Sequence, residues 1–190
     1  MTIATKLEYL DHFASQSIFR LLLETLSRPG QISQLAQTEL GALVLPLALG
    51  DVHTRVAVCA SEELQNDVVW ATGAVLTGLD DADLVACCED IDAASIKQLR
   101  RGTALVPELG AKIAINCHQL HADASGELTL TLSGPGVEGS ITLGLDGLAR
   151  EVVDAIIEAN AHFPAGIDVW FVDQSGHLAA LPRSCRVEVR

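Results

Sequence analysis

The stretch HFPAGIDVWFVDQSGHLAALPR, from His162 to Arg183, decides the fold because it predicts the end of a helix followed by two strands. Pro164 cannot continue a helix, since its ring clashes with the preceding turn and it has no amide donor. An apolar strand over 167–172 follows, and a second strand closes on Leu181. The polar exception in the first strand is Asp168, and a carboxylate there is either paired or placed at the exposed end.

Patterns typical of helices and strands alternate on the N-terminal side of this stretch. Helices are predicted over 11–27, 40–49, 66–76, 92–101 and 146–160, the second of them kinked or starting near Pro46. Strands are predicted over 54–59, 84–88, 112–117, 127–132, 140–143 and 184–189, with 31–35 as a short strand or extended segment. A turn over 123–126 is predicted to join 112–117 and 127–132 into an antiparallel hairpin, with 140–143 extending its edge. The alternation indicates an α/β fold in which helices cover a mixed, mainly parallel sheet, and residues 1–190 are predicted to form a single domain.

Composition limits the function further. The chain has 190 residues, 49% hydrophobic and 19% charged, which is typical of a globular protein with an aliphatic core. The net charge of -13 argues against binding to nucleic acids or to anionic membranes, because both require basic surfaces. The longest uncharged run, 68–79, is far shorter than the roughly 20 residues of a membrane span. Residues 1–10 lack an apolar signal-peptide core, and five cysteines fit a reducing compartment, so a cytoplasmic location is predicted.

Several familiar active sites have no motif in this sequence. It contains no P-loop, no Gly-x-Ser-x-Gly elbow, no His-Glu-x-x-His helix and no Cys-x-x-Cys pair. The most metal-like cluster is Cys117, His118 and His121, which needs further ligands to complete a site. An ordinary loop with two exposed histidines is the favoured interpretation, so no metal site is predicted.

Two glycine-rich segments have alternative interpretations. Ser133-Gly134-Pro135-Gly136 presents backbone amides that suit an anion, or it forms a tight turn that ends a strand. Arg28-Pro29-Gly30 is first of all a helix terminator. Arg183 is a partner for Asp168 or for another subunit, or else a solvated side chain.

These segments together resemble one known family. The segments that carry the resemblance, in chain order, are Phe19-Arg20-Leu21-Leu22 with Ser27-Arg28-Pro29-Gly30-Gln31-Ile32, Gly102-Thr103-Ala104 with Pro107-Glu108-Leu109-Gly110-Ala111, Leu132-Ser133-Gly134-Pro135-Gly136, Phe163-Pro164-Ala165-Gly166-Ile167-Asp168, Leu181-Pro182-Arg183 and Val187-Glu188-Val189. The ordered set, which covers nearly the whole chain, resembles the PhnH family, the H subunit of the bacterial carbon–phosphorus (C-P) lyase system.

The resemblance implies a cytoplasmic subunit of a phosphonate-degrading core complex with subunits G, I and J, and a homodimer when the subunit is alone. In that family's pathway, subunits G, H and I are associated with replacing the adenine of ATP by a phosphonate, which gives α-D-ribose 1-methylphosphonate 5-triphosphate. The nucleosidase-like chemistry is attributed to subunit I and the radical iron–sulfur cleavage to subunit J. The family fold, a three-layer α/β/α sandwich, resembles the large domain of pyridoxal-phosphate (PLP)-dependent transferases without PLP.

No cofactor is predicted for this chain. It has three lysines, Lys6, Lys97 and Lys112, and none lies in a recognisable Schiff-base motif. The family supplies no catalytic residue or metal ligand to carry over.

The motif residues that match the family pattern are predicted to contact a ligand or a partner subunit. They are Arg20, Arg28, Pro29, Gly30, Ser133, Gly134, Pro135, Gly136, Asp168 and Arg183. The arginine guanidinium group suits phosphoryl oxygens, whereas structural roles are the default for the glycines and prolines. Asp168 is predicted to start its strand and to fix the entry turn over 164–166.

Two hypotheses for function follow. The favoured one is a binding and assembly subunit that uses an apolar sheet edge or helix surface. The alternative is a stand-alone enzyme that processes a nucleotide or a phosphonate, although no coherent set of acid, base and nucleophile is visible in the sequence.

Overall fold

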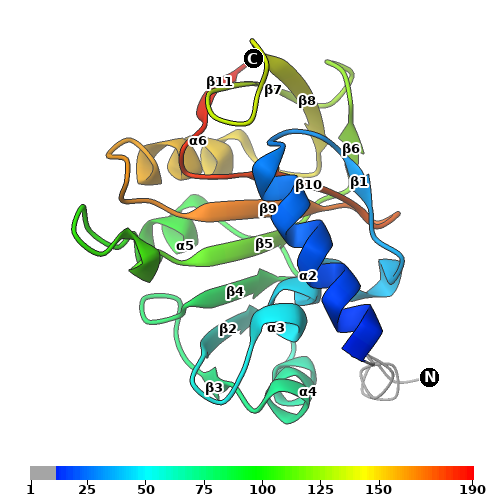
Figure 1. Ribbon diagram of the computed structural model, residues 1–190, viewed down its shortest axis with the longest axis vertical. Coiled ribbons are helices and arrows are strands. Elements are labelled where there is room, and N and C mark those ends of the chain that lie inside the picture. Colours follow the sequence, from blue (N-terminus) through cyan, green and yellow to red (C-terminus); the bar gives the residue numbers. More distant parts are fainter. Residues whose placement is uncertain (1–11) are drawn as a thin grey trace.

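A computed structural model describes residues 12–190 of the chain, which fold into two sheets and a set of helices (Figure 1). The helices are α2 (His12–Ser27), α3 (Val44–Leu49), α4 (Glu62–Thr72), α5 (Ala93–Gln98) and α6 (Arg150–Ala159), with 3-10 helices η1 (Thr38–Leu43) and η2 (Pro107–Leu109). The strands are β1 (Ser33–Gln34), β2 (Arg55–Cys59), β3 (Val75–Leu76), β4 (Leu84–Cys87), β5 (Lys112–Asn116), β6 (Gln119–His121), β7 (Leu128–Ser133), β8 (Ile141–Asp146), β9 (Asp168–Val172), β10 (His177–Leu181) and β11 (Arg186–Val189). Within residues 12–190, no helix combines the length and the hydrophobicity that crossing a bilayer requires.

The larger sheet has seven strands in the order β1-β10-β9-β5-β4-β2-β3. Strands β3, β2, β4, β5 and β9 are parallel, whereas β10 and β1 join in the antiparallel direction. The smaller sheet is antiparallel, with four strands in the order β11-β7-β8-β6. The predicted α/β fold with a mixed sheet is therefore confirmed.

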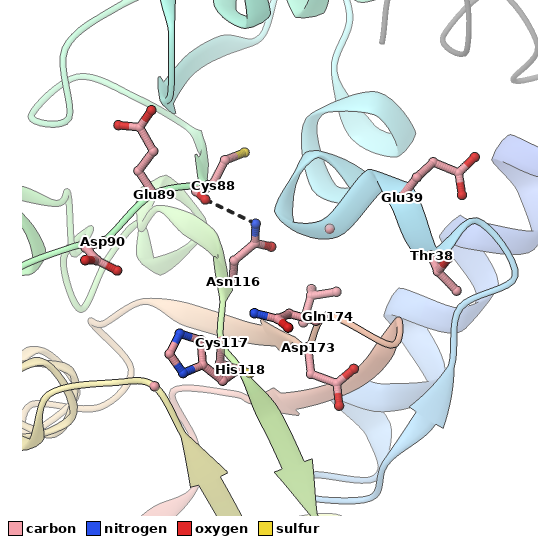
Figure 2. Close-up of a pocket in the computed structure, with 13 residues that line it drawn as sticks. Thr38, Glu39, Cys88, Glu89, Asp90, Asn116, Cys117, His118, Asp173 and Gln174 are labelled. Atoms are coloured by element: carbon pink, nitrogen blue, oxygen red, sulfur yellow. Dashed lines mark hydrogen bonds between the residues drawn. The ribbon is translucent and has the colours of Figure 1, made fainter. Parts of the chain in front are cut away.

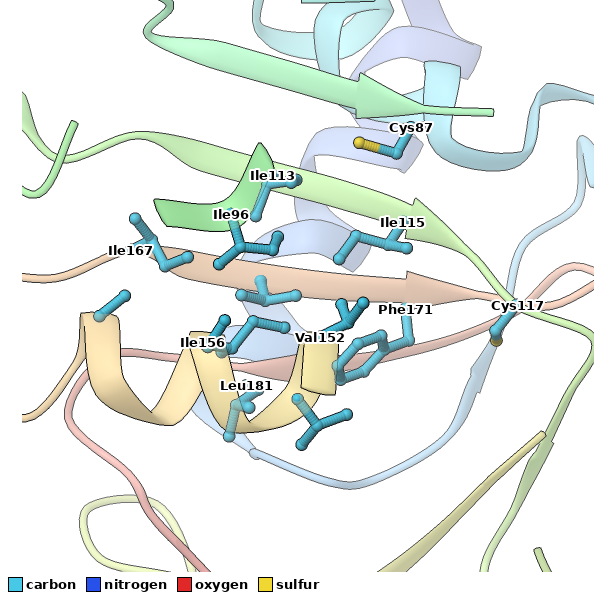
Figure 3. Packing of buried hydrophobic residues seen from close by; sticks show 14 of the residues in the cluster. Cys87, Ile96, Ile113, Ile115, Cys117, Val152, Ile156, Ile167, Phe171 and Leu181 are labelled. Carbon is cyan, nitrogen blue, oxygen red and sulfur yellow. The ribbon is translucent and has the colours of Figure 1, made fainter. Parts of the chain in front are cut away.

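Helices cover both faces of the larger sheet. In β9, Phe171 lies in the same apolar cluster as Val152 and Ile156 of α6 (Figure 3). Its neighbour Trp170 points to the opposite face, into a cluster with Leu22 of α2. This alternation follows from the two-residue period of a strand, and it repeats in β4 and β5. Helices α5 and α6 therefore cover one face, and α2, α3 and α4 cover the other (Figure 1).

The predicted hairpin between 112–117 and 127–132 is wrong. Strand β5 lies between β4 and β9 in parallel, whereas β7 pairs with β8 and β11 in the smaller sheet. The three central residues of β5 are fully buried, as expected for a strand covered on both faces, and that pattern favours a central parallel strand over a hairpin. Strand β8 is also an inner strand between β7 and β6, and not the edge that 140–143 was predicted to form.

The boundaries of four helices differ from the sequence prediction. The predicted helix over 40–49 is divided between η1 and α3, which begins at Val44, and residues 75–76, predicted as the end of a helix, form β3. Helix α4 begins after Ser61, whose hydroxyl accepts from the Leu64 amide, and ends at Gly73 with φ +71°. The predicted start at residue 66 is wrong, because the helix begins at Glu62, directly after this cap. Helix α5 ends before Leu99, so residues 99–101 are not helical. Helix α6 starts only at Arg150.

The late start of α6 has a simple cause. Asp146 pairs with Gln119 in the smaller sheet, so the backbone there is extended. The apolar spacing that predicts the helix is correct from Val152 onward. The predicted start of the first helix at residue 11 lies outside the described residues.

The turn that leads into β9 is held by Asn160. Its side-chain oxygen accepts from the Ile167 amide at 2.8 Å, and the Gly166 amide donates to the Arg101 carbonyl at 2.7 Å. Asp168 does start β9, as predicted, but its carboxylate accepts from Arg183. The prediction that Asp168 fixes the entry turn is therefore wrong, because Asn160 performs that role.

Candidate functional site

A cavity of about 290 Å³ opens where the parallel strands β4, β5 and β9 end (Figure 2). It is lined by Thr38, Glu39, Gly41, Cys88, Glu89, Asp90, Asn116, Cys117, His118, Gly147, Val172, Asp173 and Gln174. Ligands of open α/β sheets bind in the crevice outside the carboxyl ends of the strands. This cavity is therefore the candidate site.

Asn116, the last residue of β5, shapes one wall of the cavity. Its Oδ1 accepts from the Ala42 amide at 2.7 Å, and its Nδ2 donates to the Cys88 carbonyl at 3.3 Å (Figure 2). Gly41 has φ +50°, and a Cβ there would come within 2.7 Å of Asn116 Oδ1. Asn116 thus joins η1 to the end of β4, and a glycine is required where the two meet.

Asp173, directly after β9, is buried and fully hydrogen-bonded. Its carboxylate accepts from the amides of Leu120, Ser175 and His177 at 3.2, 2.8 and 2.9 Å, and its Oδ2 lies 2.9 Å from His177 Nδ1. Burial raises the pKa of Asp173, but the hydrogen bonds from His177, Leu120 and Ser175 outweigh it, and the pKa lies below its ordinary value. Asp173 therefore fixes the β9–β10 turn against β6.

The lowered pKa of Asp173 predicts a pH-dependent stability. Because the folded pKa lies below the unfolded value of about 3.9, the carboxylate stabilises the fold above that pH and loses its contribution as pH falls through the folded pKa. We expect Asp173→Asn to lower the free energy of unfolding at pH 7, and the difference from wild type to narrow below about pH 4. Urea denaturation at a series of pH values measures this; a difference that stays constant down to pH 3 would contradict the assigned role.

The remaining polar groups make the cavity acidic. Glu39, Glu89 and Asp90 line it, while neither lysine nor arginine does so within the described chain. The ring of His118 packs on Gly147, where a Cβ would come within 2.6 Å of its Nδ1. Such a lining suits hydrogen-bond donors and cationic groups and repels phosphoryl oxygens.

The two cavity thiols are not activated nucleophiles. Burial raises the pKa of Cys88 to about 12, with smaller contributions from Cys59 and Glu89. Burial likewise raises the pKa of Cys117 to about 12, with Asp173 adding to it. Both are therefore neutral thiols at neutral pH, and the thiolate is the form that attacks.

Cys117, His118 and His121 do not converge. Cys117 is buried in the apolar core (Figure 3), His118 lines the cavity, and His121 Nε2 lies 2.8 Å from Asp146 Oδ2. Nowhere in residues 12–190 do three or more His, Cys, Asp or Glu side chains gather in a way that could hold a metal ion.

Two of the family-like motifs pack against each other. Gly136 and Gly30 have φ of +81° and +75°. A Cβ on Gly136 would lie 2.9 Å from Pro29 Cδ, and one on Gly30 would lie 2.7 Å from Leu132 Cδ1. The turn after α2 and the turn after β7 therefore fit together only because both contain glycine, which is a structural reason for these residues.

Asp168 and Arg183 form a second junction, at the start of β9 and so away from the cavity. Arg183 Nε and Nη2 donate to the two carboxylate oxygens at 3.1 and 2.7 Å, and the Arg183 amide donates to Oδ1 at 2.9 Å. Arg183 Nη1 also donates to the Pro107 carbonyl at 2.6 Å. Of the three interpretations that the sequence allows for Arg183, the structure therefore supports the ion pair with Asp168.

None of the ten nominated residues lines the candidate site. Arg20 and Arg28 are exposed on and after α2, and Arg28 forms a surface ion pair with Glu24 at 3.4 Å. Arg183 borders a different cavity, of about 500 Å³, beside α6. Sequence reasoning missed Asn116 and Asp173, although each stands at the end of a predicted buried strand, where ligand sites of α/β sheets lie.

Comparison with known proteins identifies the family. The family described as bacterial phosphonate metabolism protein (PhnH) matches residues 10–188. The chain is 28% identical over 191 residues to the α-D-ribose 1-methylphosphonate 5-triphosphate synthase subunit PhnH of Rhizobium meliloti (strain 1021), covering 93% of this chain and 91% of that protein. It is 29% identical over 176 residues to HtxG of Stutzerimonas stutzeri, which is provisionally named as a C-P lyase subunit protein. This match covers 92% of this chain and 86% of that protein. The chain therefore belongs to the PhnH family of bacterial phosphonate metabolism proteins.

Proposed function

We propose that this chain is the H subunit of a phosphonate-degrading C-P lyase core complex. It acts with subunits G and I in forming α-D-ribose 1-methylphosphonate 5-triphosphate from ATP and an alkylphosphonate, in an assembly or binding role. The observation that carries this proposal is the family match over residues 10–188. A relative that is named as a subunit of that synthase is also similar to this chain along nearly its whole length. The proposed location is the cytoplasm.

The charge of the candidate site supports a role outside the catalytic centre. Both ATP and the triphosphate product are polyanions, and the acidic side chains of Glu39, Glu89 and Asp90 repel such groups. The cavity thiols of Cys88 and Cys117 have raised pKa values, so they supply no thiolate.

Exposed apolar side chains support assembly with subunits G, I and J, and a homodimer when the chain is alone. Trp70 of α4 is 69% exposed, and Val75 of the edge strand β3 is 51% exposed. In the part of the chain that the structure describes, β3 has a partner strand on one side alone. Leu105, in the loop before η2, is 92% exposed. Apolar groups beside an open sheet edge are the features that interfaces cover.

We also propose that the three-layer arrangement is that of the large domain of PLP-dependent transferases, without PLP. The layers, the parallel strands and the cavity at their carboxyl ends support this proposal. Lys97 pairs with Glu158 on the surface, and Lys112 is the first residue of β5, at the end of the strand opposite the cavity. A Schiff base to PLP in this cavity therefore has no lysine among the described residues.

Reconstitution tests the proposed function and the alternative of a stand-alone enzyme. Purified G and I subunits are incubated with ATP and methylphosphonate, with and without this chain, and adenine release is measured. We expect release when all three are present and none from this chain alone, because its cavity repels the nucleotide. Turnover by the chain alone would establish the alternative, and full turnover by G and I without it would contradict the proposed role.

A further inference from the structure

Two cysteines face each other across neighbouring parallel strands. Cys59 ends β2 and Cys87 ends β4, and the two residues are directly paired in the ladder. The Cα atoms of paired residues on adjacent strands are roughly 4.8 Å apart, and their side chains point to the same face of the sheet. This distance lies within the range of Cα–Cα separations found in disulfides. The two Sγ atoms are 3.7 Å apart. A bond between them therefore needs side-chain rotation and no movement of the sheet.

The two thiols differ in exposure and in acidity. Cys59 is half-buried, whereas Cys87 is completely buried in the apolar cluster that also contacts Cys59. The hydrogen bond from the Cys87 thiol lowers the pKa of Cys59, and burial and Glu89 act in the opposite direction. The hydrogen bond to Cys59 and burial raise the pKa of Cys87, so Cys59 is the accessible sulfur that attacks first. Once Cys59 is bonded to another sulfur, its thiolate no longer accepts that hydrogen bond, the largest cause of the raised Cys87 pKa is gone, and Cys87 becomes the resolving thiol behind it.

We propose that Cys59 and Cys87 are a redox-active thiol pair that closes into an intramolecular disulfide on reaction with a low-molecular-weight disulfide such as oxidised glutathione. The Cys59 thiolate attacks one sulfur of the reagent, the reagent's S–S bond breaks, and one glutathione thiolate leaves. The Cys87 sulfur then attacks Cys59 and displaces the second glutathione thiolate, which takes the proton that Cys87 releases. The two protein thiols are oxidised, and one oxidised glutathione is reduced to two thiols.

The proposed bond lies beside the candidate site. The Cys59 carbonyl accepts from the amides of Cys88 and Glu89 at 3.1 and 3.3 Å, and both residues line the cavity. Oxidation of the pair therefore links the ends of β2 and β4 covalently, directly beside the cavity wall formed by Cys88 and Glu89. The reactivity proposed for Cys59 and Cys87 follows from the distance between the two sulfurs and from their exposure, and does not depend on the proposed function.

Mass spectrometry of the folded, reduced chain after incubation with oxidised glutathione tests the proposal. Digestion at aspartate separates the two cysteines, because Asp80, Asp81 and Asp83 lie between them. We expect a disulfide-linked peptide pair containing Cys59 and Cys87, and the loss of two free thiols per chain.

Cys88→Ser is the matched control, because it removes the neighbouring sulfur and leaves the proposed pair intact. The linked peptide must persist in this variant and disappear in Cys59→Ser. Fragmentation of the wild-type peptide between Cys87 and Cys88 gives the same assignment if the variant fails to fold. Glutathione retained on Cys59 as a mixed disulfide, a link to Cys88, or no reaction while circular dichroism reports a folded chain would each overturn the proposal.

Discussion

Replacing Arg183 with alanine is expected to lower the free energy of unfolding by about 3–5 kcal/mol, because it leaves the largely desolvated Asp168 carboxylate without its partner. The side chains of Arg183 and Asp168 are 11% and 16% exposed, so water replaces little of the lost interaction. The variant also removes the donor to the Pro107 carbonyl, which ties the η2 loop to the β10–β11 connection. Urea denaturation at pH 7 measures the effect.

Arg28→Ala is the matched control for this prediction. Arg28 pairs with Glu24 at 3.4 Å, but their side chains are 61% and 55% exposed. Exposed ion pairs contribute about 0–1 kcal/mol, so the control should stay close to wild type. Equal losses in the two variants would show that the Asp168–Arg183 pair is no more buried in solution than a surface pair, which contradicts the structure.

Replacing Trp170 with alanine is expected to cost about 3–5 kcal/mol of stability, because it opens a cavity between the sheet and α2. Trp170 is 1% exposed and lies among the apolar side chains of α2 and α3. Its indole Nε1 donates to Thr25 Oγ1 at 3.1 Å, which attaches β9 to α2. The chain's other tryptophan provides the comparison in the same urea titration.

Trp70 is 69% exposed on α4, and its replacement by alanine should change the free energy of unfolding of the isolated chain by no more than about 0.5 kcal/mol. The two variants remove the same side chain, from a buried position in one case and from an exposed position in the other. A Trp70→Ala loss as large as that of Trp170→Ala would mean that Trp70 is covered in solution, as it would be in a homodimer. Size-exclusion chromatography of both variants separates that case from an error in the fold.

The stretch from His162 to Arg183 shows how much of the fold is predictable from sequence. The helix stop before Pro164 and the two strands that follow are confirmed, because proline geometry and a nearly continuous apolar run act locally. The partition into two sheets was not predictable in this way. The alternating leucines of β7 predict a half-buried strand, but they do not specify which strand pairs with it.

The candidate site was harder to predict than the fold. Several motif residues that resemble the PhnH family lie where segments of the fold pack together. Gly30 and Gly136 allow two turns to contact each other, and Arg183 forms an ion pair with Asp168. The cavity is instead built by Asn116 and Asp173, which no motif singled out. Their position becomes meaningful only when β5 and β9 are known to be adjacent and parallel, and that pairing depends on contacts distant in sequence.

Co-purification with the other subunits of its own C-P lyase system tests the central claim most directly. An affinity-tagged copy of this chain is expressed together with untagged G, I and J subunits, and the captured material is separated by size-exclusion chromatography. Membership of the PhnH family and the proposed assembly role predict that all four chains elute together in fixed proportions. A complex of G, I and J that forms without the tagged chain, while the tagged chain elutes alone, would contradict the claim.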